Sequence, residues 1–217
     1  LYDKERSLNP IQKEVVIAKK LATSSSIISW AKDEKNAELK RKGIIELESF
    51  RLAFTDKSYF FAIKKSGHYY FNNSKNQYAN KQLRYTLNKK DPEDQWFFRT
   101  LEQKEKCLLN VDYDEKISVT KVWINCVVKE NKVPLGIIGT GIDLTQFIQN
   151  VVDLPQEGIM NIFLDHSGAI QAHRKKELID FRSISKETSQ RKLIFSLIDH
   201  QKERIMIKKL MKELRNN

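Results

Sequence analysis

Cysteine and histidine, which often bind metals or act in catalysis, are scarce in this sequence and are not spaced as a site. Neither cysteine has a second cysteine two or three residues away, and no Gly-x-Ser-x-Gly, His-Glu-x-x-His or Walker motif is present. The histidines show no metal-ligand spacing either: His68, His166, His173 and His200. The sequence therefore predicts no metal, no cofactor and no enzymatic activity for this fragment.

The short glycine motif Gly139-Thr140-Gly141 could suggest a dinucleotide-binding loop, because it follows a predicted strand. The third glycine of that fingerprint is absent, and no βαβ unit surrounds the motif. We interpret it as strand-end geometry.

The two cysteines, Cys107 and Cys126, fall on adjacent predicted strands. With a turn near residue 115, Cys107 would face about residue 123, which places Cys126 about 10 Å along the strand. A disulfide tolerates Cα separations of only about 7 Å. This register favours two separate thiols over a disulfide bond.

Composition excludes several classes of protein. The 217 residues include only 7 Gly and 4 Pro, too few for a collagen-like or low-complexity chain. Hydrophobic residues make up 40% of the chain, which allows a modest core in one or two domains. The longest apolar stretch is shorter than the roughly 18 residues that a membrane span needs. The chain begins at Leu1 without a signal peptide, so we interpret it as a fragment.

The net charge of +11 raises a competing hypothesis, a basic nucleic-acid-binding protein. The basic residues are spread along the chain, however, with one concentration at residues 200–217, where apolar residues recur at helical spacing. We favour an amphipathic helix with a solvated basic face over contact with lipid headgroups or nucleic acid. The interpretation therefore includes no nucleic-acid partner.

Hydrophobic periodicity predicts a long N-terminal helix followed by a sheet. Asn9 and Pro10 are typical of a helix start, and apolar residues then recur at helical spacing to about residue 55, with residues 23–26 as the place of any kink. The stretch 72–90 is polar, and a helix is expected over 91–104. Strands are predicted at 59–63, 68–71, 107–113, 117–129 and 133–140, which gives an α+β fold with one five-stranded antiparallel sheet.

The C-terminal part repeats this pattern incompletely. After a helix from Asp143 to about residue 152, a hairpin is predicted over 160–165 and 169–173, turning at His166-Ser167-Gly168. Ser66-Gly67 lies 101 residues before Ser167-Gly168 in an equivalent turn, which suggests a weak internal repeat. A two-stranded hairpin is marginal alone, so we expect the natural chain to continue past Asn217.

Four segments of the sequence resemble the double Cache sensor domain of bacterial transmembrane receptors, in the version found on diguanylate cyclases. They are Asp91-Pro92-Glu93-Asp94-Gln95-Trp96-Phe97-Phe98, Leu109-Asn110-Val111-Asp112-Tyr113, Val122-Trp123-Ile124-Asn125, and the run from Pro134 to Leu144. The resemblance covers about residues 58–148, and Ile170-Gln171-Ala172-His173 extends it into the repeat.

This resemblance implies a domain organisation and a cellular role. Residues 1–57 would be a long N-terminal helix, 58–157 a membrane-distal PAS-like ligand-binding module, and 158–217 an incomplete membrane-proximal module. The chain would be an extracytoplasmic (periplasmic) small-molecule sensor in the cell inner membrane, anchored by flanking spans and able to form a homodimer. A diguanylate cyclase (GGDEF) output is expected, with a chemoreceptor or histidine kinase as the alternative.

The resemblance also implies a set of ligand-binding residues. Members that bind amino acids share a Tyr on the second strand, an Arg-x-Trp-Tyr motif, a later Tyr closely followed by Asp, and an Asp after the last strand. The matching positions here are Tyr69 or Tyr70, Trp96 with Phe97 in place of Tyr, Tyr113 with Asp114, and Asp143. The Arg position holds Asp94.

An aspartate in place of arginine changes the expected ligand, because an Arg fork grips a carboxylate whereas Asp94 would repel one. Aromatic faces with carboxylates suit an amine or quaternary ammonium. Each residue also has a plainer structural explanation. Asp143 and Gln146 resemble a helix-capping pair, Asp94 lies in the first turn of a helix, and Trp96 fits a core aromatic. For Trp123 we favour packing over ligand contact.

Overall fold

The computed structural model describes residues 2–103, 106–117, 119–152, 158–165, 167–182 and 185–216. Its helices are α1 (Tyr2–Ala22), α2 (Ser25–Lys32), α3 (Ala37–Ala53), α4 (Gln95–Glu102), α5 (Leu144–Phe147) and α6 (Gln201–Asn216). Its strands are β1 (Tyr59–Ile63), β2 (His68–Asn72), β3 (Leu83–Thr86), β4 (Cys107–Asp114), β5 (Val119–Glu130), β6 (Val133–Asp143), β7 (Phe163–Leu164) and β8 (Ile170–Ala172). The predicted α+β class is confirmed.

The main sheet is antiparallel, with strand order β3-β2-β1-β6-β5-β4. It has six strands, not the five predicted, because β3 lies within the stretch 72–90 that was taken as polar. This strand is only four residues long, and all four of its residues are exposed or half-buried. It therefore lacks the run of buried apolar residues by which a strand is recognised in the sequence. Tyr85 nevertheless stacks on Tyr69 of β2, with ring centroids 4.5 Å apart.

The predicted single helix over residues 10–55 is wrong. The helical segment begins at Tyr2, before the expected start at Asn9. It breaks at residues 23–24, within the stretch predicted for a kink, and again between α2 and α3, where no break was predicted. The second break is set by Asn36, whose side-chain oxygen accepts hydrogen bonds from the amides of Glu38 and Leu39. This N-cap starts α3 and lets the chain turn back as a helical hairpin.

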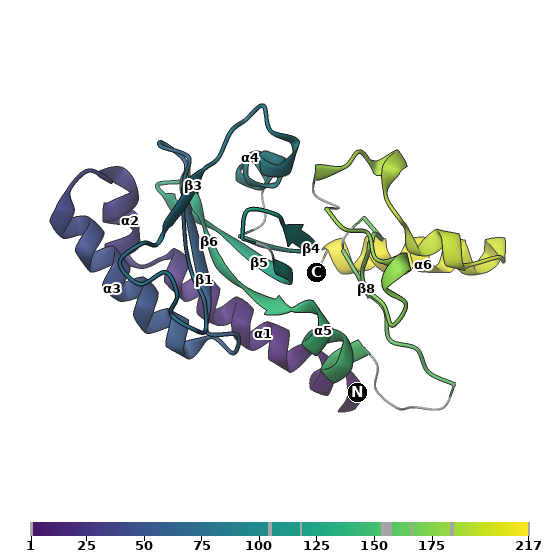
Figure 1. The fold of residues 1–217 in the computed structure, drawn as a ribbon. Coiled ribbons are helices and arrows are strands. Elements are labelled where there is room, and N and C mark those ends of the chain that lie inside the picture. The colour runs from purple at the N-terminus through teal and green to yellow at the C-terminus, as the bar shows by residue number, and fades with distance from the viewer. Residues whose placement is uncertain are drawn as a thin grey trace.

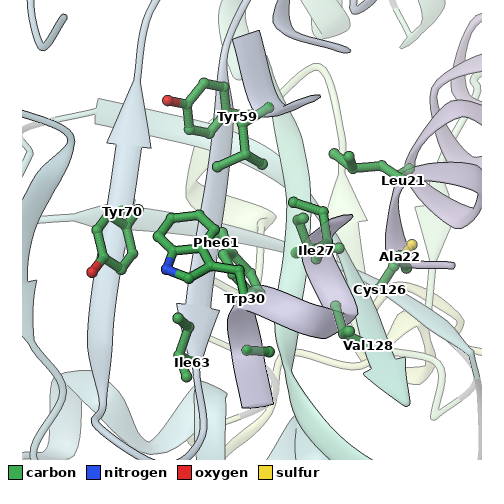
Figure 2. Close-up of a cluster of buried hydrophobic side chains, with 14 of the residues drawn as sticks. Leu21, Ala22, Ile27, Trp30, Tyr59, Phe61, Ile63, Tyr70, Cys126 and Val128 are labelled. Atoms are coloured by element: carbon green, nitrogen blue, oxygen red, sulfur yellow. The ribbon is translucent and has the colours of Figure 1, made fainter. Parts of the chain in front are cut away.

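The hairpin packs with α1 on one face of the sheet, and Trp30 lies at the centre of this core (Figure 1, Figure 2). The Trp30 ring contacts Phe61 and Tyr70 at centroid distances of 5.3 and 4.7 Å. A Cβ on Gly43 of α3 would overlap the Trp30 ring. Glycine is therefore what allows α3 to approach this indole so closely.

The other face of the sheet carries α4 and a second aromatic core. Because side chains alternate along a strand, neighbouring residues serve different faces. Tyr69 packs with Phe60 and Trp123 on the α4 face, whereas Tyr70 packs with Trp30 on the face of α1–α3. The two alternatives that the sequence left open for the second-strand tyrosine are thus on opposite sides of the sheet.

Cys107 and Cys126 form a disulfide, so the prediction of separate thiols is wrong. Asp114 pairs with Val119 across the β4–β5 turn, which brings Cys107 directly opposite Cys126 with 4.0 Å between their Cα atoms. The error came from the assumed turn position, since a shift of the turn centre slides every cross-strand pair. The disulfide closes the open end of the β4–β5 hairpin.

The C-terminal unit, residues 158–216 with the gaps given above, lies beside β4 (Figure 1). Its short strands β7 and β8 pair as an antiparallel hairpin within the predicted segments. Gly168 of the predicted turn has a φ of +87°, while His166 lies outside the described residues. Among the helices that the structure describes, none combines the length and apolar character required to cross a bilayer.

Reduction of the Cys107–Cys126 disulfide should destabilise the protein. A bridge between residues 19 positions apart restricts the unfolded chain and contributes about 3 kcal/mol. Dithiothreitol should therefore lower Tm by about 6–12 °C in a thermal unfolding experiment. The Cys107→Ser/Cys126→Ser variant should start from the lower Tm and not respond to reductant. An equal response of both proteins, or free thiols in the unreduced protein, would contradict the assigned bridge.

Candidate functional site

A pocket lies on the α4 face of the sheet, between β4, β5, the first residues of α4 and the turn after β4. Its volume open to the centres of water molecules is about 40 Å³, room for about three waters. The lining combines aromatic, amide and charged side chains: Phe60, Tyr69, Tyr85, Glu93, Asp94, Trp96, Asn110, Asp112, Tyr113, Asp114, Glu115, Lys116, Trp123 and Asn125. An occupant that fits without rearrangement is compact.

Aromatic rings form the apolar wall of the pocket. The Phe60 ring stacks parallel to Tyr69 with centroids 5.7 Å apart. Trp96 and Trp123 both stand edge-on to Phe60, at 5.8 and 5.6 Å. This mutual packing fixes the positions of the rings that line the pocket.

Asp94 belongs to the pocket wall, but its carboxylate is already paired. The residue is 1% exposed. Its Oδ1 lies 2.6 Å from the Lys116 ammonium, and its Oδ2 accepts a hydrogen bond from the Asn88 amide at 2.7 Å. Lys116 also lies 3.3 Å from Asp91. Asp94 therefore positions Lys116 and the loop before α4.

Asp114 also lines the pocket, and its contacts are those of a turn residue. Its Oδ1 accepts hydrogen bonds from the amides of Lys116 and Ile117, and its Oδ2 accepts one from the Tyr85 hydroxyl at 3.2 Å. Burial raises the pKa of Asp114, and these hydrogen bonds oppose the rise. Tyr113, the residue before Asp114 on β4, also contributes to the pocket lining and is 42% exposed.

Asp112 is the carboxylate whose hydrogen bonding is incomplete. It faces the pocket from the same side of β4 as Asn110. Its buried Oδ1 accepts no hydrogen bond. The nearest cation is the Arg182 guanidinium, whose Nε lies 3.4 Å from that oxygen. Burial raises the pKa of Asp112 to about 7, while Arg182 acts to lower it. The site thus holds a poorly solvated carboxyl group that a further cation would stabilise.

Two amides complete the polar wall beside Asp112. Asn125 of β5 donates a hydrogen bond to the side-chain oxygen of Asn110 at 2.5 Å. Both residues are about 2% exposed. This pair fixes the orientation of the amides next to the two tryptophans.

The structure brings together five of the sequence-predicted residues, Tyr69, Asp94, Trp96, Tyr113 and Asp114, in the pocket lining. The other three lie elsewhere. The Tyr70 hydroxyl donates to Glu34 on the opposite face of the sheet, and Phe97 packs into the α4 core. Asp143 accepts a hydrogen bond from the Gln146 amide as the N-cap of α5 and lines a separate open groove.

Several lining residues were not predicted from the sequence. Trp123 was assigned to packing, yet it forms part of the wall, together with Asn125. Tyr85 was hidden in the polar stretch, and Asp112 was passed over for Asp114. The available signal was the alternation on β4 and β5, which places Asn110 and Asp112 on the same face as Trp123 and Asn125.

No known protein-family model matches the chain. Solved structures with a similar fold include the ligand-binding domain of the Pseudomonas fluorescens chemoreceptor CtaA in complex with L-serine, with TM-score 0.57, 15% identity, and coverage of 82% of this chain and 70% of that one. The ligand-binding domain of the Pseudomonas aeruginosa chemoreceptor PctB in complex with L-Gln matches with TM-score 0.58 and 16% identity. This match covers 85% of this chain and 69% of that one. The sensor domain of the V. cholerae histidine kinase DctB matches with TM-score 0.55 and 9% identity. This match covers 78% of this chain and 61% of that one.

These matches confirm the predicted fold, which the chain shares with the ligand-binding and sensor domains named above. The chain spans between 61% and 70% of the three matched domains. At sequence identities of 9–16%, the similarity to these domains is one of fold alone.

The Asp112→Asn variant should gain stability over the wild type as the pH rises. In the wild type the folded carboxyl, with a pKa near 7, keeps a proton that the unfolded chain loses near pH 4, so stability falls between these values. The expected difference is on the order of 4 kcal/mol at pH 8, or about 8–16 °C in Tm, and little at pH 4.

Thermal unfolding at both pH values measures this difference. Asp199→Asn, at an exposed position, serves as the control for loss of one carboxylate. An Asp112→Asn effect of equal size at pH 4 and pH 8 would contradict the assigned environment.

Proposed function

We propose that this chain is the sensor region of a bacterial transmembrane signalling protein and that its pocket binds a small organic cation carrying an ammonium group. The observation that carries the proposal is the buried Asp112 oxygen that accepts no hydrogen bond inside a pocket walled by aromatic rings. Ligand binding to this fold supports the sensor role, since the similar CtaA and PctB domains were solved with amino acids bound.

The charge of the pocket favours a cation over an anion. The lining carries five carboxylates and a single lysine: Glu93, Asp94, Asp112, Asp114, Glu115 and Lys116. Lys116 is held by Asp94 and Asp91, and Arg182 pairs with others of these carboxylates. The carboxylates still outnumber the two cations, so a ligand carboxylate would meet a predominantly negative wall. An ammonium group would instead donate a charge-assisted hydrogen bond to the Asp112 carboxylate.

The aromatic wall adds attraction for the same kind of ligand. A cation over a Trp or Tyr face gains roughly 0.5–2 kcal/mol per ring, and the rings are already ordered. The pocket itself already shows such a contact, with the Lys116 ammonium 4.6 Å from the centroid of Tyr85.

The domain assignment follows from the same proposal. Residues 58–157 would be the membrane-distal ligand-binding module, residues 158–217 the membrane-proximal one, and flanking spans would place both outside the cytoplasm. A homodimer and a diguanylate cyclase output remain predictions from the sequence resemblance, with a chemoreceptor or histidine kinase output as the alternative. Such a ligand signals only through different affinities for two conformations.

A thermal-shift and calorimetry series with ethylammonium, tetramethylammonium and succinate tests the ligand class. At pH 8 an ammonium compound present at about 100 times its Kd should raise stability by about 2.7 kcal/mol, whereas succinate should have no effect. Binding should weaken at least tenfold at pH 5, because Asp112, with a pKa near 7, is then protonated.

Two variants locate the binding site. Asp112→Asn should abolish ammonium binding at pH 8. Asp143→Asn should bind as the wild type does, because asparagine caps α5 as well as aspartate and the residue lies in the separate groove. Binding of succinate without any amine, or a loss of binding only in Asp143→Asn, would overturn the proposal.

A further inference from the structure

Arg182 joins the C-terminal unit to the rim of the pocket. Its guanidinium forms ion pairs with Glu93 through Nη1 and with Glu115 through Nη2, and its Nε lies 3.4 Å from Asp112. These carboxylates come from the turn before α4, from β4 and from the turn after β4. All three line the pocket, so one guanidinium balances much of its negative charge.

The backbone of Arg182 is also fixed to β4. Its amide donates a hydrogen bond to the Val111 carbonyl at 3.0 Å, and the Val111 amide donates to Gln171 of β8 at 3.1 Å. Since β4 is an edge strand, these bonds dock the C-terminal unit onto the free edge of the sheet. Arg182 adopts a φ of +60°, a left-handed conformation that is unfavourable for a residue other than glycine and is held by these contacts.

The Arg182–Asp112 pair is looser than the other two. The Asp112 Oδ1 accepts no hydrogen bond from the guanidinium, whereas Glu115 receives one at 3.0 Å. Arg182 is also about one-third exposed at its side chain, so it can move outward into solvent. An ammonium group bound at Asp112 would neutralise one of the three carboxylates and place a second positive charge beside the guanidinium.

We propose that Arg182 is an intramolecular counter-ion that competes with the ligand for Asp112, so that ammonium binding weakens the attachment of the C-terminal unit to β4. This inference rests on the proposed function. It supplies a physical route from the pocket to the neighbouring unit, through a residue that contacts both. By linkage, the attachment of Arg182 weakens ligand binding by the same factor as the ligand weakens the attachment.

Calorimetry with ethylammonium chloride compares the wild type with Arg182→Gln and Arg191→Gln at pH 9.5, where Asp112 stays ionised even without the Arg182 charge that lowers its pKa. Arg191 is the matched control, because its guanidinium donates to the Lys186 carbonyl and the Ser167 hydroxyl inside the C-terminal unit. Arg182→Gln should bind at least fivefold more tightly, because the competing charge is gone. Arg191→Gln should bind within twofold of the wild type, and Arg182→Lys should return toward the wild-type affinity.

Hydrogen exchange gives a second readout in the unmodified protein. Saturating ethylammonium should speed exchange of the amide of Arg182, which donates to Val111, and should leave the amides of β5 unchanged. This measurement does not depend on the folding of any variant. In Arg182→Gln the corresponding amide should exchange quickly with or without ethylammonium.

The outcomes separate the two proposals. If the wild type binds ethylammonium but Arg182→Gln binds equally or more weakly, or if exchange at residue 182 is unaffected by the ligand, the counter-ion role is overturned and the proposed function stands. If ethylammonium binds neither the wild type nor Arg182→Gln, the proposed function fails, and the competition between Arg182 and the ligand fails with it.

Discussion

The pleat of β4 and β5 is the constraint on which the pocket depends. It turns Asn110, Asp112, Trp123 and Asn125 to one face of the sheet, where α4 and the turn after β4 shield them from water. A carboxyl group placed there loses hydration, and the Asp112 oxygen gains no hydrogen bond in return. The raised pKa follows from this unfavourable burial, and the proposed affinity for a cation has the same physical origin.

The rest of the fold keeps that pleat in register. The Cys107–Cys126 bridge fixes one end of the β4–β5 hairpin, and the capping contacts of Asp114 fix the turn at the other. On the reverse face, Trp30 and the helices α1–α3 support the sheet through a separate apolar core. The C-terminal unit then occupies the edge of β4, so a change at Asp112 is one residue from the docking point at Val111.

Much of this arrangement could be predicted from the sequence. Alternating aromatic and β-branched runs placed five of the six strands of the main sheet, and the resemblance to sensor domains anticipated the fold and the aromatic wall with Trp96. What could not be predicted depends on register and on local caps. Asn36 starts a new helix within what looks like a continuous helical pattern. A small error in the predicted position of the β4–β5 turn placed the two bonded cysteines too far apart for a disulfide. The choice between Asp112 and Asp114 required the hydrogen bonds themselves, since adjacent acidic positions on one strand look alike until their partners are known.

The central claim is that Asp112 is a buried carboxyl group with one oxygen that accepts no hydrogen bond, poised for a cation. Carboxyl ¹³C NMR of Asp112 during a pH titration tests it most directly. The account predicts a midpoint near 7 that moves down when ethylammonium is present, because the bound cation favours the charged form. A midpoint near 4 that does not respond to ethylammonium would contradict it.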